Sequence, residues 1–142
     1  MPKAKLLLIG KGKTENQIQE KVNEFGLVES VLMLGSRQDV LSIVQQCTAL
    51  VLPSKIEGLP GVILEAMLVK TPVIAYNVGG ISEVVTATTG MLIDAGNENK
   101  FVQAMVQVAT SNNNMLVSNA YDLVTNTYNN KIISKAFFDA YK

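Results

Sequence analysis

Short runs of apolar residues alternate along the chain with stretches in which apolar and polar positions follow a helical period. The apolar runs are continuous rather than alternating, which is typical of strands that are buried on both faces of a sheet. The predicted strands are Ala4–Ile9, Val31–Leu34, Ala49–Leu52, Pro72–Tyr76 and Met91–Ile93.

Helical patterns separate these strands. Gly26 closes the first helix and Asp39 caps the second. The helices predicted between strands are Thr14–Phe25, Val40–Gln46, Val62–Val69 and a short one at Ile81–Val85. Beyond the last strand only helices are predicted, at Asn97–Thr110, Met115–Thr127 and Lys131–Tyr141. This order predicts an α/β fold with one doubly wound, Rossmann-like parallel sheet of about five strands and extra C-terminal helices.

Composition narrows the range of possible functions. The 142 residues are 48% hydrophobic and 17% charged, which indicates one globular domain over residues 1–142. Twelve basic and twelve acidic residues cancel, which argues against a general nucleic-acid binder. Histidine is absent, so histidine-based catalysis is excluded, and the single cysteine, Cys47, is expected to be a buried thiol. No apolar stretch is long enough to span a bilayer, and a cytoplasmic location is expected, at most peripheral to a membrane.

Ligands of open parallel sheets bind beyond the carboxyl ends of the strands, so phosphate-binding motifs are expected in the loops there. The loop that begins at Gly10 lacks the third glycine of a dinucleotide fingerprint, because position 15 is Glu15. It also lacks the first glycine of a P-loop, because position 7 is Leu7. A tight turn is the simpler interpretation, although the backbone at Gly10 could still border a nucleotide.

The loop after the third predicted strand carries more chemistry. Gly61 has no side chain, so a phosphate could approach the free amides of Gly61, Val62 and Ile63 at the start of a helix. Glu57 lies in the loop and Glu65 one turn into the helix, and carboxylates accept hydrogen bonds from hydroxyl groups. Either glutamate alone could be a solvated side chain. Together with Gly61, the pair favours a phosphate ligand flanked by a ribose and a sugar.

A set of motifs in consistent order resembles the C-terminal, donor-binding domain of the group 1 (family 4) retaining glycosyltransferases, which have the GT-B fold. The likeness covers nearly the whole chain. The segments that carry it are Leu8–Gly12, Val31–Gly35, Val51–Pro60, Leu64–Met67, Pro72–Ala75 and Gly79–Glu83.

The resemblance assigns roles to individual residues. It implies that Glu65 binds the ribose hydroxyls, that Glu57 is the catalytic residue near the transferred sugar, and that amides after Glu57 hold the diphosphate. Many members have glycine where this chain has Pro60, which offers no N–H, so the anion cradle would rest on Gly61 and Val62.

Other donor-binding residues are less sharply defined. The resemblance places Ser36 and Arg37 in a loop beside the base, and a solvated arginine is a nearly equal alternative. Ser54, in the loop before Glu57, belongs to the same predicted site. Gly80 could offer an amide to the cleft, or Gly79-Gly80 could be a turn that needs positive φ.

The resemblance thus implies a glycosyltransferase of hexosyltransferase type that takes a nucleoside-diphosphate sugar and transfers its glycosyl group to an acceptor hydroxyl. No metal and no cofactor beyond the donor are expected. The acceptor, a glycan or lipid, would be held by an N-terminal domain, so the chain is expected to be a fragment that is inactive alone. A non-catalytic nucleotide-sugar binding module and a GT-B epimerase or phosphorylase remain alternatives.

The resemblance also implies that a family strand is missing beside Ala4–Ile9. An empty slot in a sheet would leave backbone groups unpaired. We therefore expect Ala4–Ile9 to pair directly with Ala49–Leu52, giving one sheet of order 2-1-3-4-5 and a narrowed diphosphate pocket that binds nucleotide weakly or not at all. Strand exchange with a neighbouring chain is the alternative.

Overall fold

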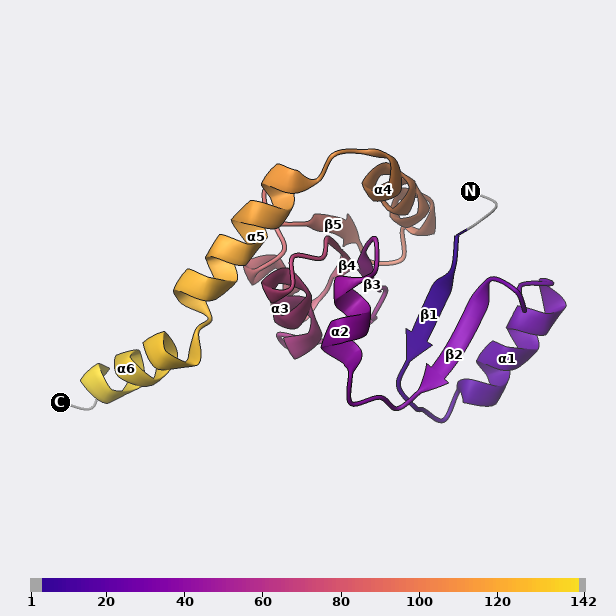
Figure 1. Ribbon diagram of the computed structural model, residues 1–142, viewed down its shortest axis with the longest axis horizontal. Coiled ribbons are helices and arrows are strands. Elements are labelled where there is room, and N and C mark those ends of the chain that lie inside the picture. Colours follow the sequence, from indigo (N-terminus) through magenta and orange to yellow (C-terminus); the bar gives the residue numbers. More distant parts are fainter. Residues whose placement is uncertain (1–3, 141–142) are drawn as a thin grey trace. The chain divides into compact units, whose positions relative to one another are not determined.

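The computed structural model describes residues 4–140 of the chain (Figure 1). The chain divides into two compact units, and the boundary between them falls between Val40 and Leu41. Every strand pair within either unit is parallel, and helices connect the strands, so the predicted α/β, Rossmann-like character is confirmed.

The first unit holds strands β1 (Leu6–Ile9) and β2 (Val31–Gly35), joined through helix α1 (Glu15–Glu24). Helix α1 ends as its sequence predicts. Gly26 adopts φ +63°, and the N–H of Leu27 donates to the carbonyl of Val22 at 2.8 Å, which is the hydrogen bond of a Schellman motif.

The second unit contains most of the chain. Helix α2 (Val40–Gln45) leads into a sheet of order β3-β4-β5, in which β4 is central. The elements that follow α2 are β3 (Leu50–Leu52), α3 (Gly61–Leu68), β4 (Val73–Asn77), the 3₁₀-helix η1 (Gly79–Glu83), β5 (Met91–Asp94), α4 (Glu98–Thr110), α5 (Asn114–Thr127) and α6 (Asn130–Ala140).

Strand β4 is buried on both faces, as its continuous apolar run predicts. Ile74 and Tyr76 belong to a cluster with α4, in which the rings of Tyr76 and Phe101 meet edge to face at 4.8 Å between centroids. The alternate residues Val73 and Ala75 are also buried, and α3 contacts β4. The strand therefore anchors the whole unit.

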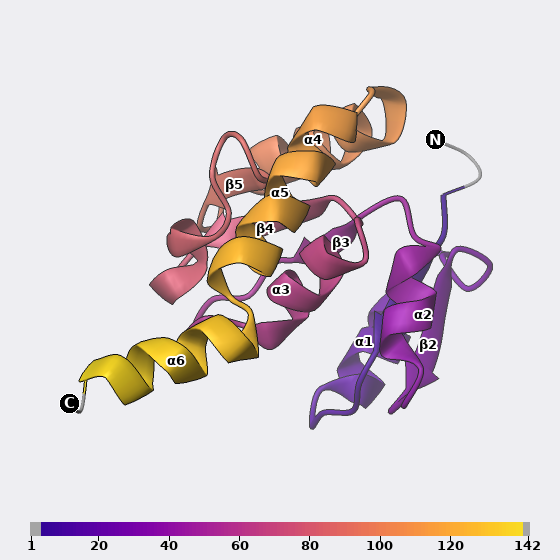
Figure 2. The ribbon, with the colours of Figure 1, turned by 60° about the vertical axis from the view of Figure 1, so that its left-hand side comes forward.

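Helix α3 carries the predicted site and is held by its packing and by its C-terminal end. It packs against α5, beside which it lies in both ribbon views (Figures 1 and 2). At its C-terminal end Lys70 has φ +62°, and the N–H of Thr71 donates to the carbonyl of Ala66 at 2.9 Å in a second Schellman motif. The Thr71 hydroxyl donates to the carbonyl of Val44 at 2.9 Å. This hydrogen bond connects α2 to the C-terminal end of α3.

The predicted pairing of the first and third strands is wrong. The described strands form two sheets, β1-β2 and β3-β4-β5, so β1 bonds only to β2 and β3 only to β4. The expectation of a pocket narrowed by that pairing loses its basis. Smaller differences concern boundaries: the short helix is a 3₁₀-helix that begins at Gly79 instead of Ile81, and Tyr141 lies outside the described residues.

Two further expectations concern single features. Cys47 is half-buried rather than fully buried, and its thiol lies 3.3 Å from the carbonyl oxygen of Ile43. Across residues 4–140, none of the helices has both the length and the apolar character needed to cross a membrane.

Candidate functional site

The start of α3 presents backbone donors. Pro60 precedes the helix with extended backbone, φ −72° and ψ 122°, and supplies no N–H itself. Within the described part of the chain, the N–H groups of Gly61 and Val62 have no acceptor. The N–H of Ile63 does have one, because it donates to the Pro60 carbonyl at 3.1 Å. The prediction of three free amides is thus reduced to two.

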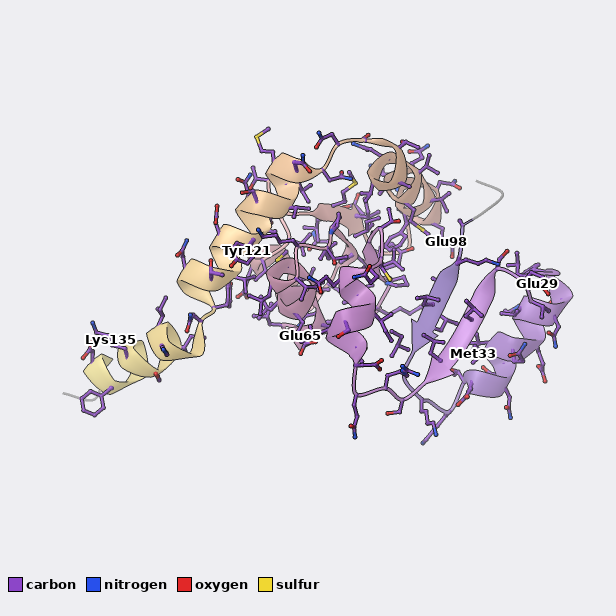
Figure 3. All side chains as sticks on the ribbon, viewed as in Figure 1. Glu29, Met33, Glu65, Glu98, Tyr121 and Lys135 are labelled. Atoms are coloured by element: carbon purple, nitrogen blue, oxygen red, sulfur yellow. The ribbon has the colours of Figure 1, made fainter. Side chains whose placement is uncertain are left out.

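The two predicted glutamates lie on either side of these donors in the sequence. Glu65 is an exposed side chain of α3 (Figure 3), whereas Glu57 is half-buried in the loop between β3 and α3. Neither carboxylate has a hydrogen bond or ion pair with any residue from 4 to 140. Both are therefore available to a ligand, and Ser54 is half-buried in the same loop as Glu57.

The Gly79-Gly80 turn plays a different part from the one predicted for Gly80. Gly79 adopts φ +55°, so of the two alternatives the structure favours a turn that needs positive φ. The N–H of Gly80 donates to the carbonyl of Gly58 at 2.9 Å and is not free for a ligand. The turn therefore supports the loop that carries Glu57. The paired glycines signal the turn in the sequence, but nothing local shows which loop it supports.

The first unit holds the other predicted residues at the carboxyl ends of its strands. Gly10 has φ +126° and donates its N–H to the carbonyl of Gly35 at 2.8 Å, which joins the loops after β1 and β2. Ser36 and Arg37 follow directly and are exposed. Gly10, Ser36 and Arg37 thus lie at one edge of this unit.

Arg37 is engaged by a neighbouring carboxylate. Its Nε donates to Oδ1 of Asp39 at 2.8 Å and its Nη2 to Oδ2 at 2.6 Å, a two-point pairing. The hydrogen bond raises the pKa of Arg37 above its usual value and lowers the pKa of Asp39 below its own. An anionic ligand would have to compete with Asp39 for this guanidinium.

The chemistry open to the second unit is that of anion and hydroxyl recognition. Free amides at the start of a helix stabilise negative charge, and ionised carboxylates accept hydrogen bonds from sugar hydroxyls. Among residues 4–140 there is no group of three or more histidine, cysteine, aspartate or glutamate side chains that could hold a metal ion.

Comparison with known proteins identifies the family. Residues 1–111 match the family model described as "Glycosyl transferases group 1", and the chain belongs to this family. The resemblance drawn from the motifs is confirmed. The matched region includes both glutamates, the Gly61 turn and the Gly79-Gly80 turn.

Two curated relatives illustrate the match. The UDP-Gal:alpha-D-GlcNAc-diphosphoundecaprenol alpha-1,3-galactosyltransferase of Escherichia coli is 29% identical over 132 residues, which cover 91% of this chain and 34% of that enzyme. The N-acetyl-alpha-D-glucosaminyl L-malate synthase of Bacillus anthracis is 33% identical over 106 residues, which cover 74% of this chain and 28% of that enzyme.

The fold is shared with solved structures. A mutant of TarM from S. aureus, in complex with fondaparinux, alpha-GlcNAc-glycerol and UDP, superposes with a TM-score of 0.87 at 21% identity, over 95% of this chain and 28% of that protein. The chain spans about a third or less of the length of each of these three proteins.

Proposed function

We propose that this chain is the donor-binding part of a retaining glycosyltransferase, which transfers a glycosyl group from a nucleoside diphosphate to an acceptor hydroxyl. The bond between the anomeric carbon and the diphosphate oxygen breaks, a bond to the acceptor oxygen forms, and the hydroxyl proton passes to the departing diphosphate. The acceptor, a glycan or lipid, would be bound by residues outside this chain, since the match covers only about a third of the length of these relatives.

The observation that carries the proposal is the pair of unsatisfied amides at Gly61 and Val62, one turn before Glu65, in a chain of the group 1 family. The amides and the positive end of α3 would hold the diphosphate and stabilise its charge as it departs. Glu65 would accept hydrogen bonds from the ribose hydroxyls, and Glu57 would face the transferred sugar. The E. coli relative, whose name includes UDP-Gal, supports a nucleotide-sugar donor of this kind.

Gly61 offers a direct test, because the helix itself tolerates a side chain there. A Cβ built on Gly61 meets nothing within 4 Å, and its φ is not positive. Gly61→Ala should leave thermal stability unchanged or slightly raised, since alanine favours a helix more than glycine does. The added methyl would stand where the phosphate approaches the amides.

The experiment is calorimetric titration of the protein that contains this chain with UDP, GDP, ADP, dTDP and UMP. One diphosphate should bind, UMP should bind more weakly, and Gly61→Ala should reduce the diphosphate affinity by about tenfold or more, the equivalent of a lost hydrogen bond. Equal binding of UMP and UDP, or unchanged affinity in a folded Gly61→Ala protein, would show that no diphosphate lies against these amides. Binding without transfer to any acceptor would favour a binding module.

A further inference from the structure

Two loops at the carboxyl edge of the second sheet touch through their backbones. A Cβ placed on Gly79 would lie 1.8 Å from the carbonyl oxygen of Glu57 and 2.8 Å from its carbonyl carbon. The neighbouring Gly80 donates its N–H to the carbonyl of Gly58 at 2.9 Å. The peptide group that joins Glu57 to Gly58 therefore rests directly on the Gly79-Gly80 turn.

The turn itself is firmly held. It follows β4, the central strand, and Ile81, Val84 and Val85 behind it have no exposed surface. The N–H of Val85 donates to the carbonyl of Ile81 at 2.8 Å, which stabilises the backbone turn that follows η1. The loop with Glu57, by contrast, contains an exposed Ile56, whose side chain is 89% accessible. Ile56 therefore contributes little packing to the loop, and the contact with the turn holds the loop through its backbone.

From this contact we propose that Gly79 and Gly80 are positioning residues: they form a backbone seat that fixes the peptide after Glu57 and so sets the direction of the Glu57 carboxylate. The inference rests on the proposed function, in which that carboxylate faces the transferred sugar. We expect the seat to act more on the reacting sugar than on the nucleotide, because it contacts the peptide between Glu57 and Gly58, whereas the amides proposed to hold the diphosphate are those of Gly61 and Val62, at the start of α3.

The seat explains why both positions are glycine. At Gly79 a side chain would meet backbone atoms, which cannot rotate away as the end of a flexible side chain can, and the positive φ adds strain. At Gly80 the fit is tight without being prohibitive, because a Cβ would lie 3.2 Å from the Gly58 oxygen. A methyl group at Gly79 would displace the Glu57–Gly58 peptide, and one at Gly80 would press on the Gly58 carbonyl and on Oε1 of Glu83, which lies 3.3 Å from the Cβ.

Three variants separate displacement from strain. Gly79→Ala combines a severe clash with positive φ and is expected to destabilise the protein. Gly80→Ala requires the Gly58 carbonyl to give by only a few tenths of an ångström, so a folded protein is expected. Gly26→Ala is the matched control for strain, because Gly26 has φ +63° and a Cβ there meets nothing within 4 Å.

Steady-state kinetics and calorimetry of the full-length protein then give the result. Gly80→Ala should reduce kcat by about tenfold to a hundredfold, because a small misplacement of a reacting group is costly, while the affinity for the nucleoside diphosphate changes less than about twofold. In a Glu57→Gln background the same change should add little, since the group that the seat directs is already impaired. Gly26→Ala should leave kcat unchanged.

The proposal of a backbone seat would be overturned if Gly80→Ala reduced kcat and diphosphate affinity equally. It would also be overturned if the effects of Gly80→Ala and Glu57→Gln on kcat were fully additive. A second readout separates its failure from that of the proposed function. The carboxylate ¹³C signal of Glu57, assigned by Glu57→Gln, should shift in Gly80→Ala while the signal of Glu65 stays in place. If the signal shifts but no diphosphate binds the wild-type protein, the proposed function is wrong and the catalytic role with it. If the signal does not shift, the seat is wrong whatever the protein binds.

Discussion

The ammonium group of Lys70 lies over the ring of Tyr121, with Nζ 4.6 Å from the ring centroid. This contact joins the C-terminal end of α3 to α5, which is the helix that carries Tyr121 (Figure 3). Lys70 is also, among residues 4–140, the one non-glycine residue with positive φ. A residue that costs conformational strain therefore holds the end of the helix from which Glu65 projects.

Substitutions at Lys70 should separate these two effects. Lys70→Ala loses the contact with Tyr121 and keeps the strain, whereas Lys70→Gly loses the contact and relieves the strain. In urea unfolding, Lys70→Gly should therefore be more stable than Lys70→Ala by about 1 kcal/mol. An alanine variant as stable as the glycine variant would show that the backbone at position 70 is not strained.

Glu65→Gln should weaken nucleoside-diphosphate binding by ~1 to 3 kcal/mol, because charge-assisted hydrogen bonds to the ribose become neutral ones. Calorimetry of the protein containing this chain measures the change. Glu98→Gln is the control, since Glu98 is also an exposed glutamate of a helix in the same unit. Equal affinity of wild type and Glu65→Gln would remove Glu65 from the proposed site.

Glu57→Ala should affect turnover far more than nucleotide affinity. If the carboxylate faces the reacting sugar, its loss lowers kcat by about a hundredfold and leaves the diphosphate dissociation constant nearly unchanged. Initial rates with a saturating donor and titration with the diphosphate give the two values. Parallel losses in both would assign Glu57 to nucleotide binding instead.

The pairing of Arg37 with Asp39 predicts a pH dependence of definite sign. The pKa of Asp39 is lowered in the folded protein, so the pair contributes stability above the ordinary pKa of aspartate, and this contribution is lost as the pH falls through the lowered value. Because both groups are exposed, the effect on stability should be small. NMR titration of Asp39 should show a midpoint below its ordinary value, and Arg37→Ala should raise that midpoint. An unchanged midpoint would mean that the pair does not form in solution.

The pattern of apolar and polar residues predicted the helices and strands of this fold well, because buried positions are occupied by apolar residues. The continuous apolar run over Val73–Tyr76 is buried on both faces as expected, and Gly26 ends α1 as a glycine at that position should. Lys70 ends α3 in the same way, but no sequence signal marks it, since the left-handed conformation usually selects glycine.

What the sequence could not predict is which separate segments meet. The pairing of the first and third strands was expected from a rule about unpaired edges, and the strands fall in two sheets instead. The amide of Gly80 was expected to face a ligand and bonds to Gly58. The residue types at both places are compatible with either arrangement, so only the three-dimensional structure distinguishes them. The roles of Glu57 and Glu65 stay predictions.

The central position of β4 has a consequence for motion. Strand β4 has a hydrogen-bonded neighbour strand on each side, and both of its faces are buried. We therefore expect hydrogen exchange of the β4 amides to require cooperative opening of most of the second unit. Asn77, the last residue of this strand, stands two positions before Gly79. The backbone on which the Glu57 loop rests is thus an extension of the segment expected to exchange most slowly. Fluctuations of that loop should therefore be confined to its exposed tip at Ile56. The backbone contact at its base should open only when the second unit unfolds.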